Sequence, residues 1–350
     1  MIQLPRRNEM FEIESRRYVG NKFKLMSWIS ELLLSNCPEC HSFFDVFAGT
    51  GTVSKCVLGQ YDEIILNDFL FSNQVIYNAF FSNEKFDDEK VKIIAQQYKS
   101  LDKESLTDNY VSEQYGDKFF SLLDARAIGF VREDIQQKKE QGIINDKESS
   151  ILLASLLYSL DRIANTCGHY DAYIKGKSIR DEFSFELIKP LNTFGKSISI
   201  YREDSNQLVR SVSADIAFID PPYNSRQYSR FYHVLENITK WEKPKLYGVA
   251  MKPREENMSE YCRATAPQVF SDLIVNLKAK YIVVTYNNTY NSKSSSSQNK
   301  ISLEEIKQIL DKKGVTDIYE KPYRFFNAGK TDLADHKEYV FVTKVKSNGD

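Results

Sequence analysis

Short apolar runs alternate with helix-like stretches along this chain. Three of these runs, at 43–47, 63–67 and 215–219, each end in an acidic or glycine-containing turn. Continuous apolar strands are typical of a parallel sheet that is covered by helices on both faces. Further strands are predicted at 281–286, 315–319 and 338–344, and helices at 24–34, before Lys280 and at 303–312. The pattern therefore predicts a doubly wound α/β fold.

A long stretch separates the second and third of these strands. It covers about 145 residues (68–214), with helical patterns at 118–139 and 149–164. One sheet connection does not need that length, so an inserted, mainly helical domain is expected. The alternative is that these helices only support the sheet. The segment 287–300 is rich in Asn, Ser and Lys and is expected to be a mobile loop.

Composition places the chain among globular proteins. Its 350 residues leave room for about two domains, and 47 basic against 48 acidic residues give a net charge of −1. No apolar run approaches the length needed to cross a bilayer, and no secretion signal opens the chain, so we expect no membrane association and a cytoplasmic location. Five cysteines do not suggest a disulfide framework, and the lone Cys37-x-x-Cys40 pair does not suggest a metal. A zinc site there is the alternative.

Distinctive residues follow two of the predicted strands. Gly49 and Gly51 form a turn after the first strand, where backbone N–H groups can approach a ligand. Asp68 follows the second strand, where a carboxylate can accept both ribose hydroxyls of a nucleoside. The alternatives are an ordinary strand-to-helix turn and a cap for the helix that starts at Phe71. Together the glycine turn and the acid predict one nucleoside site.

The tetrapeptide Asp220-Pro221-Pro222-Tyr223 follows the third strand. Two prolines fix the backbone and remove two N–H donors, so the carboxylate and the neighbouring carbonyl are held at the strand end. Acceptors at a fixed spacing beside an aromatic ring suit a flat base with an exocyclic amine. The alternative is a rigid turn with a structural aspartate.

These motifs resemble those of a known enzyme family. The run 220–223 resembles the catalytic motif of amino-methyltransferases, and Asp45-Val-Phe-Ala-Gly-Thr-Gly51 resembles their S-adenosylmethionine motif. Arg17-Tyr-Val-Gly-Asn-Lys22 resembles the additional cofactor motif of the Dam-like (D12, alpha) class of DNA adenine-N6 methyltransferases, and the order of motifs is that of the class. The runs 166–173, 220–228 and 232–237 are similar to methyltransferases of type IIS restriction systems.

The resemblance implies a fold, a reaction and a cofactor. The fold would be a doubly wound, Rossmann-like methyltransferase sheet with an inserted, mainly helical target-recognition domain. The catalytic domain would comprise 1–79 and 196–350, and the recognition region 80–195. The reaction would be site-specific transfer of a methyl group from S-adenosylmethionine to N6 of adenine in duplex DNA. The enzyme would be the modification component of a restriction-modification system.

The resemblance also assigns roles to residues. Asp220 and the carbonyl of Pro221 would accept the amine hydrogens, with Pro222 in the same motif and Tyr223 stacked on the adenine. The cofactor would contact Tyr18, Lys22, Asp45, Phe47, Gly49, Gly51, Asp68 and Asp204. No metal is required. The alternatives are a solvated basic turn for Tyr18 and Lys22, and a helix N-cap for Asp204.

A duplex base cannot reach such a pocket, so the target adenine should be flipped out. Residues expected to bind DNA are Arg226, His169, Lys175, Lys177 and Arg180, the last four within a loop at 165–180. Six basic residues against three acidic ones between Arg6 and Lys24 form a further candidate for phosphate contacts, although charge runs are usually solvated faces.

Two alternatives from other classes stay open. A ribosomal RNA or protein-glutamine methyltransferase could use a similar strand-end motif, but the large insert and the N-terminal motif favour DNA. A non-enzymatic nucleic-acid-binding protein would not need the cofactor turn. The expected partners are duplex DNA and a cognate restriction endonuclease acting on the same site, with the chain itself a monomer. The insert gives no indication of the recognition sequence.

Overall fold

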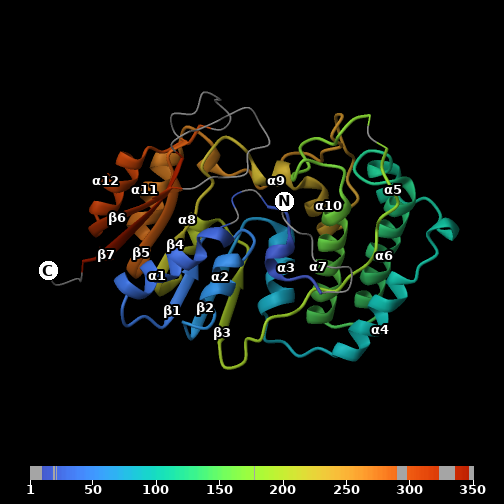
Figure 1. Ribbon diagram of the computed structural model, residues 1–350, viewed down its shortest axis with the longest axis horizontal. Coiled ribbons are helices and arrows are strands. Elements are labelled where there is room, and N and C mark those ends of the chain that lie inside the picture. The colour runs from blue at the N-terminus through green and yellow to red at the C-terminus, as the bar shows by residue number, and fades with distance from the viewer. Residues whose placement is uncertain are drawn as a thin grey trace. The chain divides into compact units, whose positions relative to one another are not determined.

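The chain forms two compact units in a computed structural model that describes residues 10–18, 20, 22–176, 178–289, 298–322 and 336–346 (Figure 1). The helical unit comprises Met1–Gly20, Phe71–Phe194 and Tyr232–Arg254. The sheet unit comprises Asn21–Leu70, Gly195–Phe231 and Glu255–Asp350. The chain thus passes from one unit to the other several times.

The sheet unit is built on a seven-stranded sheet in the order β3-β2-β1-β4-β5-β7-β6. All neighbouring pairs are parallel except those formed by β7, which runs antiparallel to β5 and to β6. The strand order reverses between β1 and β4, and in open α/β sheets ligands bind at such a reversal. The doubly wound fold expected from the sequence is therefore confirmed. The strands are β1 (Ser42–Asp45), β2 (Glu63–Asn67), β3 (Ser197–Tyr201), β4 (Ser213–Ile219), β5 (Lys278–Asn287), β6 (Gly314–Pro322) and β7 (Lys337–Val345).

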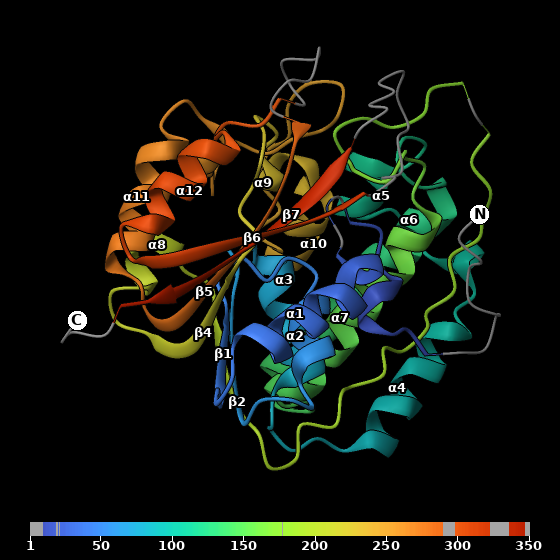
Figure 2. The same ribbon diagram turned by 60° about the vertical axis from the view of Figure 1, so that its left-hand side comes forward.

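Helices cover both faces of this sheet, as its continuous apolar strands require (Figure 2). Helices α1 (Met26–Asn36) and α2 (Thr52–Val57) lie on one face. Helices α8 (Ser205–Leu208), α11 (Ala266–Asn276) and α12 (Leu303–Asp311) lie on the other, where they bury a cluster that includes Phe44, Phe270 and Val284. The unit also contains α9 (Tyr228–Phe231) and the 3-10 turns η2 (Phe23–Leu25) and η4 (Glu260–Cys262).

One strand was not expected from the sequence. β3 lies at the edge of the sheet, where it pairs only with β2. Its sequence, Ser-Ile-Ser-Ile-Tyr, alternates polar and apolar positions, and its side chains are at most half-buried. Because an edge strand needs no continuous apolar run, the pattern that revealed the central strands could not reveal this one.

The helical unit contains no named strand among its described residues, only helices and isolated bridges. Its longest helices are α6 (Leu122–Glu140) and α7 (Asp146–Ile163), and α7 begins with a capping box between Asn145 and Glu148. Both helices were expected from the sequence, within a few residues at their ends. The other elements are η1 (Ile13–Ser15), α3 (Phe71–Phe81), α4 (Asp88–Lys99), η3 (Lys103–Ser105), α5 (Tyr110–Tyr115) and α10 (His233–Lys240).

Two buried cations hold helix ends in this unit. Lys147 donates from Nζ to the carbonyls of Asn78, Ala79 and Ser82 at the end of α3. Arg132 donates to the carbonyls of Ile238 and Thr239 near the end of α10. Burial lowers the pKa of Lys147 to about 8. A cation at a helix C-terminus satisfies carbonyls that have no partner within the helix.

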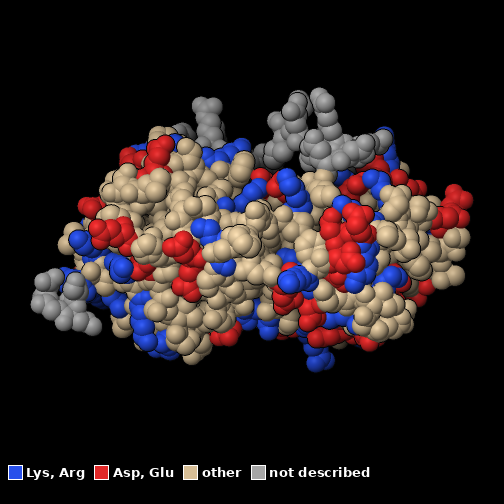
Figure 3. All heavy atoms as spheres, turned by 90° about the horizontal axis from the view of Figure 1, so that it is seen from below, with Lys and Arg blue, Asp and Glu red and all other residues tan. Residues whose placement is uncertain are grey.

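The expected insert, 80–195, lies in the helical unit except for Gly195, but that unit also includes 71–79, 232–254 and the N-terminal segment. Among the residues described, no helix is long and apolar enough to span a bilayer. Basic and acidic side chains are interspersed over the face shown in Figure 3, in keeping with the net charge of −1.

Candidate active site

The glycine turn follows β1 in the middle of the sheet. Gly49 and Gly51 have φ values of 54° and 75°, a left-handed backbone that glycine adopts without strain. The Gly49 N–H donates to Asp68 Oδ2 at 3.0 Å, so the acid after β2 fixes the turn after β1. The other oxygen of Asp68 accepts from Leu70 N. The two signals that predicted a nucleoside site are thus joined by a hydrogen bond.

The start of helix α3 is held by a carboxylate from α10. The amides of Phe71 and Ser72 donate to the carboxylate of Glu236, at 3.0 and 2.8 Å. Glu236 thus binds the first two amides of this helix, while Asp68 binds the amides of Gly49 and Leu70 before it. Glu236 belongs to the run 232–237, which is similar to methyltransferases of type IIS restriction systems, and it joins α10 to the start of α3.

Asn67 organises the same strand ends, although no sequence signal marked it. It is fully buried, and its Nδ2 donates to the Val46 carbonyl, the Glu203 carbonyl and Ser205 Oγ. Its Oδ1 accepts from Glu203 N. Asn67 thereby fixes β1, β2 and the segment after β3 relative to one another. In the sequence, Asn67 is distinguished only as a polar residue at the end of an apolar strand.

Asp45, at the end of β1, is buried and accepts a hydrogen bond from Ser54 Oγ at 2.7 Å. Burial raises its pKa to about 7, with smaller contributions from the nearby carboxylates of Asp220 and Asp68, while the bond from Ser54 lowers it. Phe47 packs edge-on against Tyr261, with ring centroids 5.1 Å apart. Both residues were expected to contact the cofactor, and both lie at the end of β1 that carries the glycine turn.

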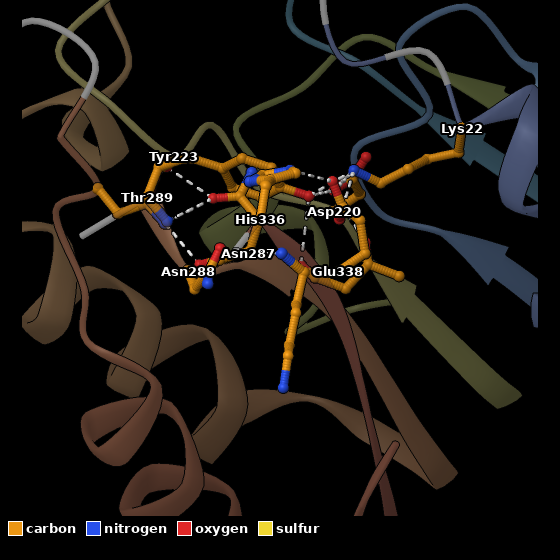
Figure 4. A network of polar contacts seen from close by, with 11 residues as sticks. Lys22, Asp220, Tyr223, Asn287, Asn288, Thr289, His336 and Glu338 are labelled. Atoms are coloured by element: carbon orange, nitrogen blue, oxygen red, sulfur yellow. Dashed lines mark hydrogen bonds and ion pairs between the residues drawn. The ribbon is translucent and has the colours of Figure 1, made fainter. Parts of the chain in front are cut away.

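Asp220 follows β4 and receives donors from three other residues (Figure 4). Lys22 Nζ lies 3.2 Å from Asp220 Oδ1, and Thr285 Oγ1 donates to the same oxygen at 2.8 Å. The hydroxyl of Tyr223 also donates to Oδ1. Burial raises the pKa of Asp220, and Lys22 and the two hydroxyl donors oppose that rise.

The side chain of Tyr223 is turned toward the carboxylate of its own motif. Its hydroxyl accepts from Lys22 Nζ at 2.6 Å, and its ring packs against Tyr286 with centroids 4.6 Å apart. The Tyr223 carbonyl accepts from Lys300 N at 2.8 Å. The motif is thus hydrogen-bonded to Lys300, the last residue of the polar segment 287–300. Residues 290–297 of that segment lie outside the described part of the chain.

Lys22 was expected to face the carboxylate of the cofactor. It is 6% exposed, and its Nζ lies 3.7 Å from Glu338 on β7 as well as 3.2 Å from Asp220. His336 lies beyond Glu338, at 3.6 Å. The sequence did not indicate Thr285, Glu338 or His336. A buried acid at the start of the apolar run 339–343 was the one available signal.

The remaining expected cofactor residues, Asp204 and Tyr18, make other contacts. Asp204 is exposed and accepts from Gln207 N at the start of α8. It is therefore the N-cap of this helix, which was the alternative to a cofactor contact. Tyr18 belongs to the helical unit, where its ring stacks on Tyr232 with centroids 4.8 Å apart and planes 5° from parallel. Arg16 is buried beside both rings.

The expected phosphate cluster near the N-terminus is not an exposed basic patch within the described residues. Arg16 is 4% exposed and donates to Asn73 Oδ1, and Arg17 is held by Asp161. Lys22 is buried in the site described above. Lys24 is exposed, and Arg6 and Arg7 lie outside the described residues. Of the four described basic residues of this stretch, two are therefore buried and a third is bound to a carboxylate inside the fold.

The expected DNA-binding loop is fastened at several points, and we call residues 165–183 the pinned segment. Asn165 donates from Nδ2 to the carbonyls of Lys118 and Ile174. The buried Tyr170 donates to Asp161 Oδ1 on α7, and its carbonyl lies 2.9 Å from His233 Nε2. The amides of Glu182 and Phe183 donate to Asp124 on α6.

The pinned segment exposes several side chains between its fastened points. Lys175 and Arg180 are exposed and His169 is half-buried, while Lys177 lies outside the described residues. Because α6 and α7 carry its anchors, these helices support the segment. In the sheet unit, the Asn224 side chain accepts from the N–H of Arg226, whose guanidinium lies over Phe231.

Metal-ligating side chains do not gather in the part of the chain that the structure describes, where no three His, Cys, Asp or Glu residues are placed to share an ion. All five cysteines are free thiols. Burial raises the pKa of Cys37 to about 12, which disfavours the thiolate that a metal would need. The absence of zinc stays a prediction.

Three comparisons bear on this arrangement. A family model described as D12 class N6 adenine-specific DNA methyltransferase matches residues 18–301. The chain is 30% identical over 360 residues to the type II methyltransferase M.FokI of Planomicrobium okeanokoites, covering 95% of the chain but 54% of M.FokI. It is also 30% identical to the type II methyltransferase M.NlaIII of Neisseria lactamica, over 93% of the chain and 98% of M.NlaIII.

The chain therefore spans about half the length of M.FokI and nearly all of M.NlaIII. Among solved structures, a Listeria monocytogenes protein described as a class I S-adenosylmethionine-dependent methyltransferase aligns with a TM-score of 0.36 and 10% identity, over 98% of this chain and 64% of that chain. The fold assignment rests on the strand order of the sheet and not on this likeness.

Proposed function

The chain belongs to the D12 class of N6 adenine-specific DNA methyltransferases, and from this we propose its reaction. The chain transfers a methyl group from S-adenosylmethionine to N6 of adenine at a specific site in duplex DNA. It serves as the modification enzyme of a restriction-modification system, in keeping with the name modification methylase LlaI of a relative from Lactococcus lactis. Membership in this family confirms the expectation drawn from the motifs.

One observation carries the proposal. Four neighbouring strands present their carboxyl ends along one edge of the sheet, in the order β2, β1, β4 and β5. They carry Asp68, the glycine turn, Asp220 and Thr285 respectively. A nucleoside acceptor and an amine acceptor thus stand on either side of the turn, which is the arrangement that a methyl donor and a target base require.

The cofactor residues fit a nucleoside. The carboxylate of Asp68 lies next to the turn, and Gly49 and Gly51 have no side chains that would keep a ligand away from the turn backbone. Asp68 would accept from the ribose hydroxyls, and Phe47 and Asp45 would close the site from the end of β1. S-adenosylmethionine, when bound, supplies a methyl group on a positively charged sulfur.

The residues of the chain would act by alignment and charge. Asp220 and the Pro221 carbonyl accept the two N6 hydrogens, which turns the amine lone pair away from the ring and toward the methyl carbon. The carboxylate of Asp220 would stabilise the positive charge that develops on N6 during methylation, and the excess N6 proton would pass to water. No covalent intermediate with the enzyme is needed.

The helical unit would recognise the target. The pinned segment is held by buried residues while it exposes Lys175 and Arg180, side chains suited to phosphates or to base edges in a groove. The target adenine would leave the helix to reach Asp220. We place this reaction in the cytoplasm, with a monomeric enzyme and a cognate endonuclease acting on the same site.

A transfer assay tests the proposal. The purified chain is incubated with methyl-labelled S-adenosylmethionine and either mixed-sequence duplex DNA or RNA, and the methylated base is identified. We expect N6-methyladenine in DNA alone. Label in RNA only, or in neither nucleic acid while the cofactor binds, would contradict it, and failure to bind the cofactor would leave only a nucleic-acid-binding protein.

A further inference from the structure

The carboxylate of Asp220 is contacted on one side only. Within the described residues, every contact that the structure shows for this group uses Oδ1, which is approached by Thr285 and also by Lys22 and Tyr223, which Figure 4 labels. Oδ2 is therefore the oxygen that remains for a ligand. An acceptor that must select one geometry of a target amine gains from this asymmetry, because the carboxylate cannot rotate without losing three donors at once.

We propose that Thr285 is a positioning residue, which anchors Asp220 Oδ1 so that Oδ2 accepts the hydrogen bond from the target amine. The inference rests on the proposed function and deepens it. Thr285 belongs to none of the motifs that resemble the family. It reaches the site because β5 lies beside β4, with Val284 paired to Ile219 immediately before Asp220.

The hydroxyl of Thr285 is held more rigidly than the ammonium group of Lys22. It is 2% exposed, and its backbone stands within β5, between the parallel strand β4 and the antiparallel strand β7. A β-branched side chain has few χ1 rotamers, so the position of its hydroxyl follows from the strand itself. Lys22, by contrast, reaches Oδ1 at the end of a flexible four-carbon stem and is shared with Glu338.

The hydrogen bond from Thr285 to Asp220 should have a measurable effect on the pH dependence of the reaction. Lys22, Tyr223, Asp45 and Glu338 face the carboxylate, and His336 lies beyond Glu338. The hydrogen bond from Thr285 favours the ionised form of Asp220, so its removal raises the pKa of Asp220 further. If the ionised carboxylate is the active form, the acidic limb of the kcat profile then moves to higher pH.

The test replaces the hydroxyl without changing the volume. Thr285→Val keeps the shape and loses the donor, Thr285→Ser keeps the donor, and Thr343→Val is the matched control. Thr343 is a fully buried threonine on β7 of the same sheet, and its hydroxyl contacts Thr316. Rates, cofactor affinity, thermal unfolding and the pH profile are measured for all three and for the wild type.

We expect Thr285→Val to lower kcat about ten- to a hundredfold with cofactor affinity within about twofold, because a hydrogen bond to a charged group is removed. Its acidic limb should move to higher pH, and Thr285→Ser should recover most of the rate. Thr343→Val should keep the wild-type kcat and pH profile.

A Thr285→Val enzyme with wild-type kcat and pH profile would overturn the inference, as would an equal loss of kcat in Thr343→Val or a loss explained by unfolding. A wild-type chain that binds the cofactor but methylates no DNA would overturn the proposed function itself.

Discussion

The strand-end site of the sheet unit and the pinned segment of the helical unit use carboxylates of low exposure in opposite ways. In the site, the carboxylate of Asp220 accepts from Lys22, Tyr223 and Thr285, whose donor groups converge on one of its oxygens. In the pinned segment, Asp124 and Asp161 accept from the segment's own backbone and from Tyr170, which leaves the intervening side chains pointing to solvent. Under the proposed function, chemistry that is the same for every target adenine takes place at a site with little exposure, whereas the surface proposed to discriminate among DNA sequences is exposed on a fixed frame.

The largest effect should follow from the removal of the carboxylate of Asp220. We expect Asp220→Ala to lower methyl transfer at least about a thousandfold, because alignment and charge stabilisation together are worth several kcal/mol. Cofactor affinity should stay within a few-fold, since the carboxylate is needed chiefly by the target amine. Transfer is measured with labelled cofactor and affinity by calorimetry. A variant that keeps more than about a tenth of the wild-type rate would contradict this role.

Removal of Asp68 should affect binding instead of transfer. Asp68→Ala should weaken S-adenosylmethionine binding by about 1–3 kcal/mol, because the ribose loses its acceptor and the Gly49 amide loses its partner. Asp62→Ala is the control: its side chain is 75% exposed and lies just before β2, at the opposite end of the strand. Equal affinities for the two variants would remove Asp68 from the cofactor site.

The pinned segment is tested by charge removal. The double variant Lys175→Ala, Arg180→Ala should bind duplex DNA less tightly while binding the cofactor as before. The slope of log affinity against log salt should decrease by about one for each phosphate that the protein no longer neutralises. Lys312→Ala, an exposed lysine after α12, should leave affinity and slope unchanged. A double variant with the wild-type salt slope would show that this segment does not bind phosphates.

The smallest effect is expected at Cys40. The protein should contain no stoichiometric zinc, because Cys37-x-x-Cys40 has no second pair and the raised pKa of Cys37 disfavours its thiolate. Cys40→Ser should then retain full activity. Elemental analysis is the measurement, and one zinc per chain would instead assign a structural metal to residues 36–41.

The sequence predicted those parts of the molecule that depend on local pattern. Five of the seven strands, β1, β2, β4, β5 and β7, have apolar cores, and the glycine turn and the 220–223 motif are contiguous in the chain. β3 was not predicted because its five residues, Ser-Ile-Ser-Ile-Tyr, contain no continuous apolar run. The contacts of Lys22 with Asp220, of Glu236 with α3 and of Thr285 with Asp220 could not be predicted, since each joins residues 65 to 198 positions apart.

The function of the basic residues could not be inferred from their number. The stretch from Arg6 to Lys24 has a local excess of positive charge, yet Arg16 and Lys22 are buried and Arg17 is bound to Asp161. Burial of a cation depends on which carboxylate or aromatic ring the fold places beside it. Charge counts therefore predict a phosphate surface only when the fold leaves the cations exposed.

One measurement tests the central claim most directly. The chain is expressed in a host that lacks other adenine methyltransferases, and the host DNA is sequenced for N6-methyladenine, with Asp220→Ala expressed in parallel. The account predicts N6-methyladenine confined to one short sequence context in the wild-type cells and absent with Asp220→Ala. An unmodified genome in cells that contain folded wild-type protein, or the same methylation with Asp220→Ala, would contradict it.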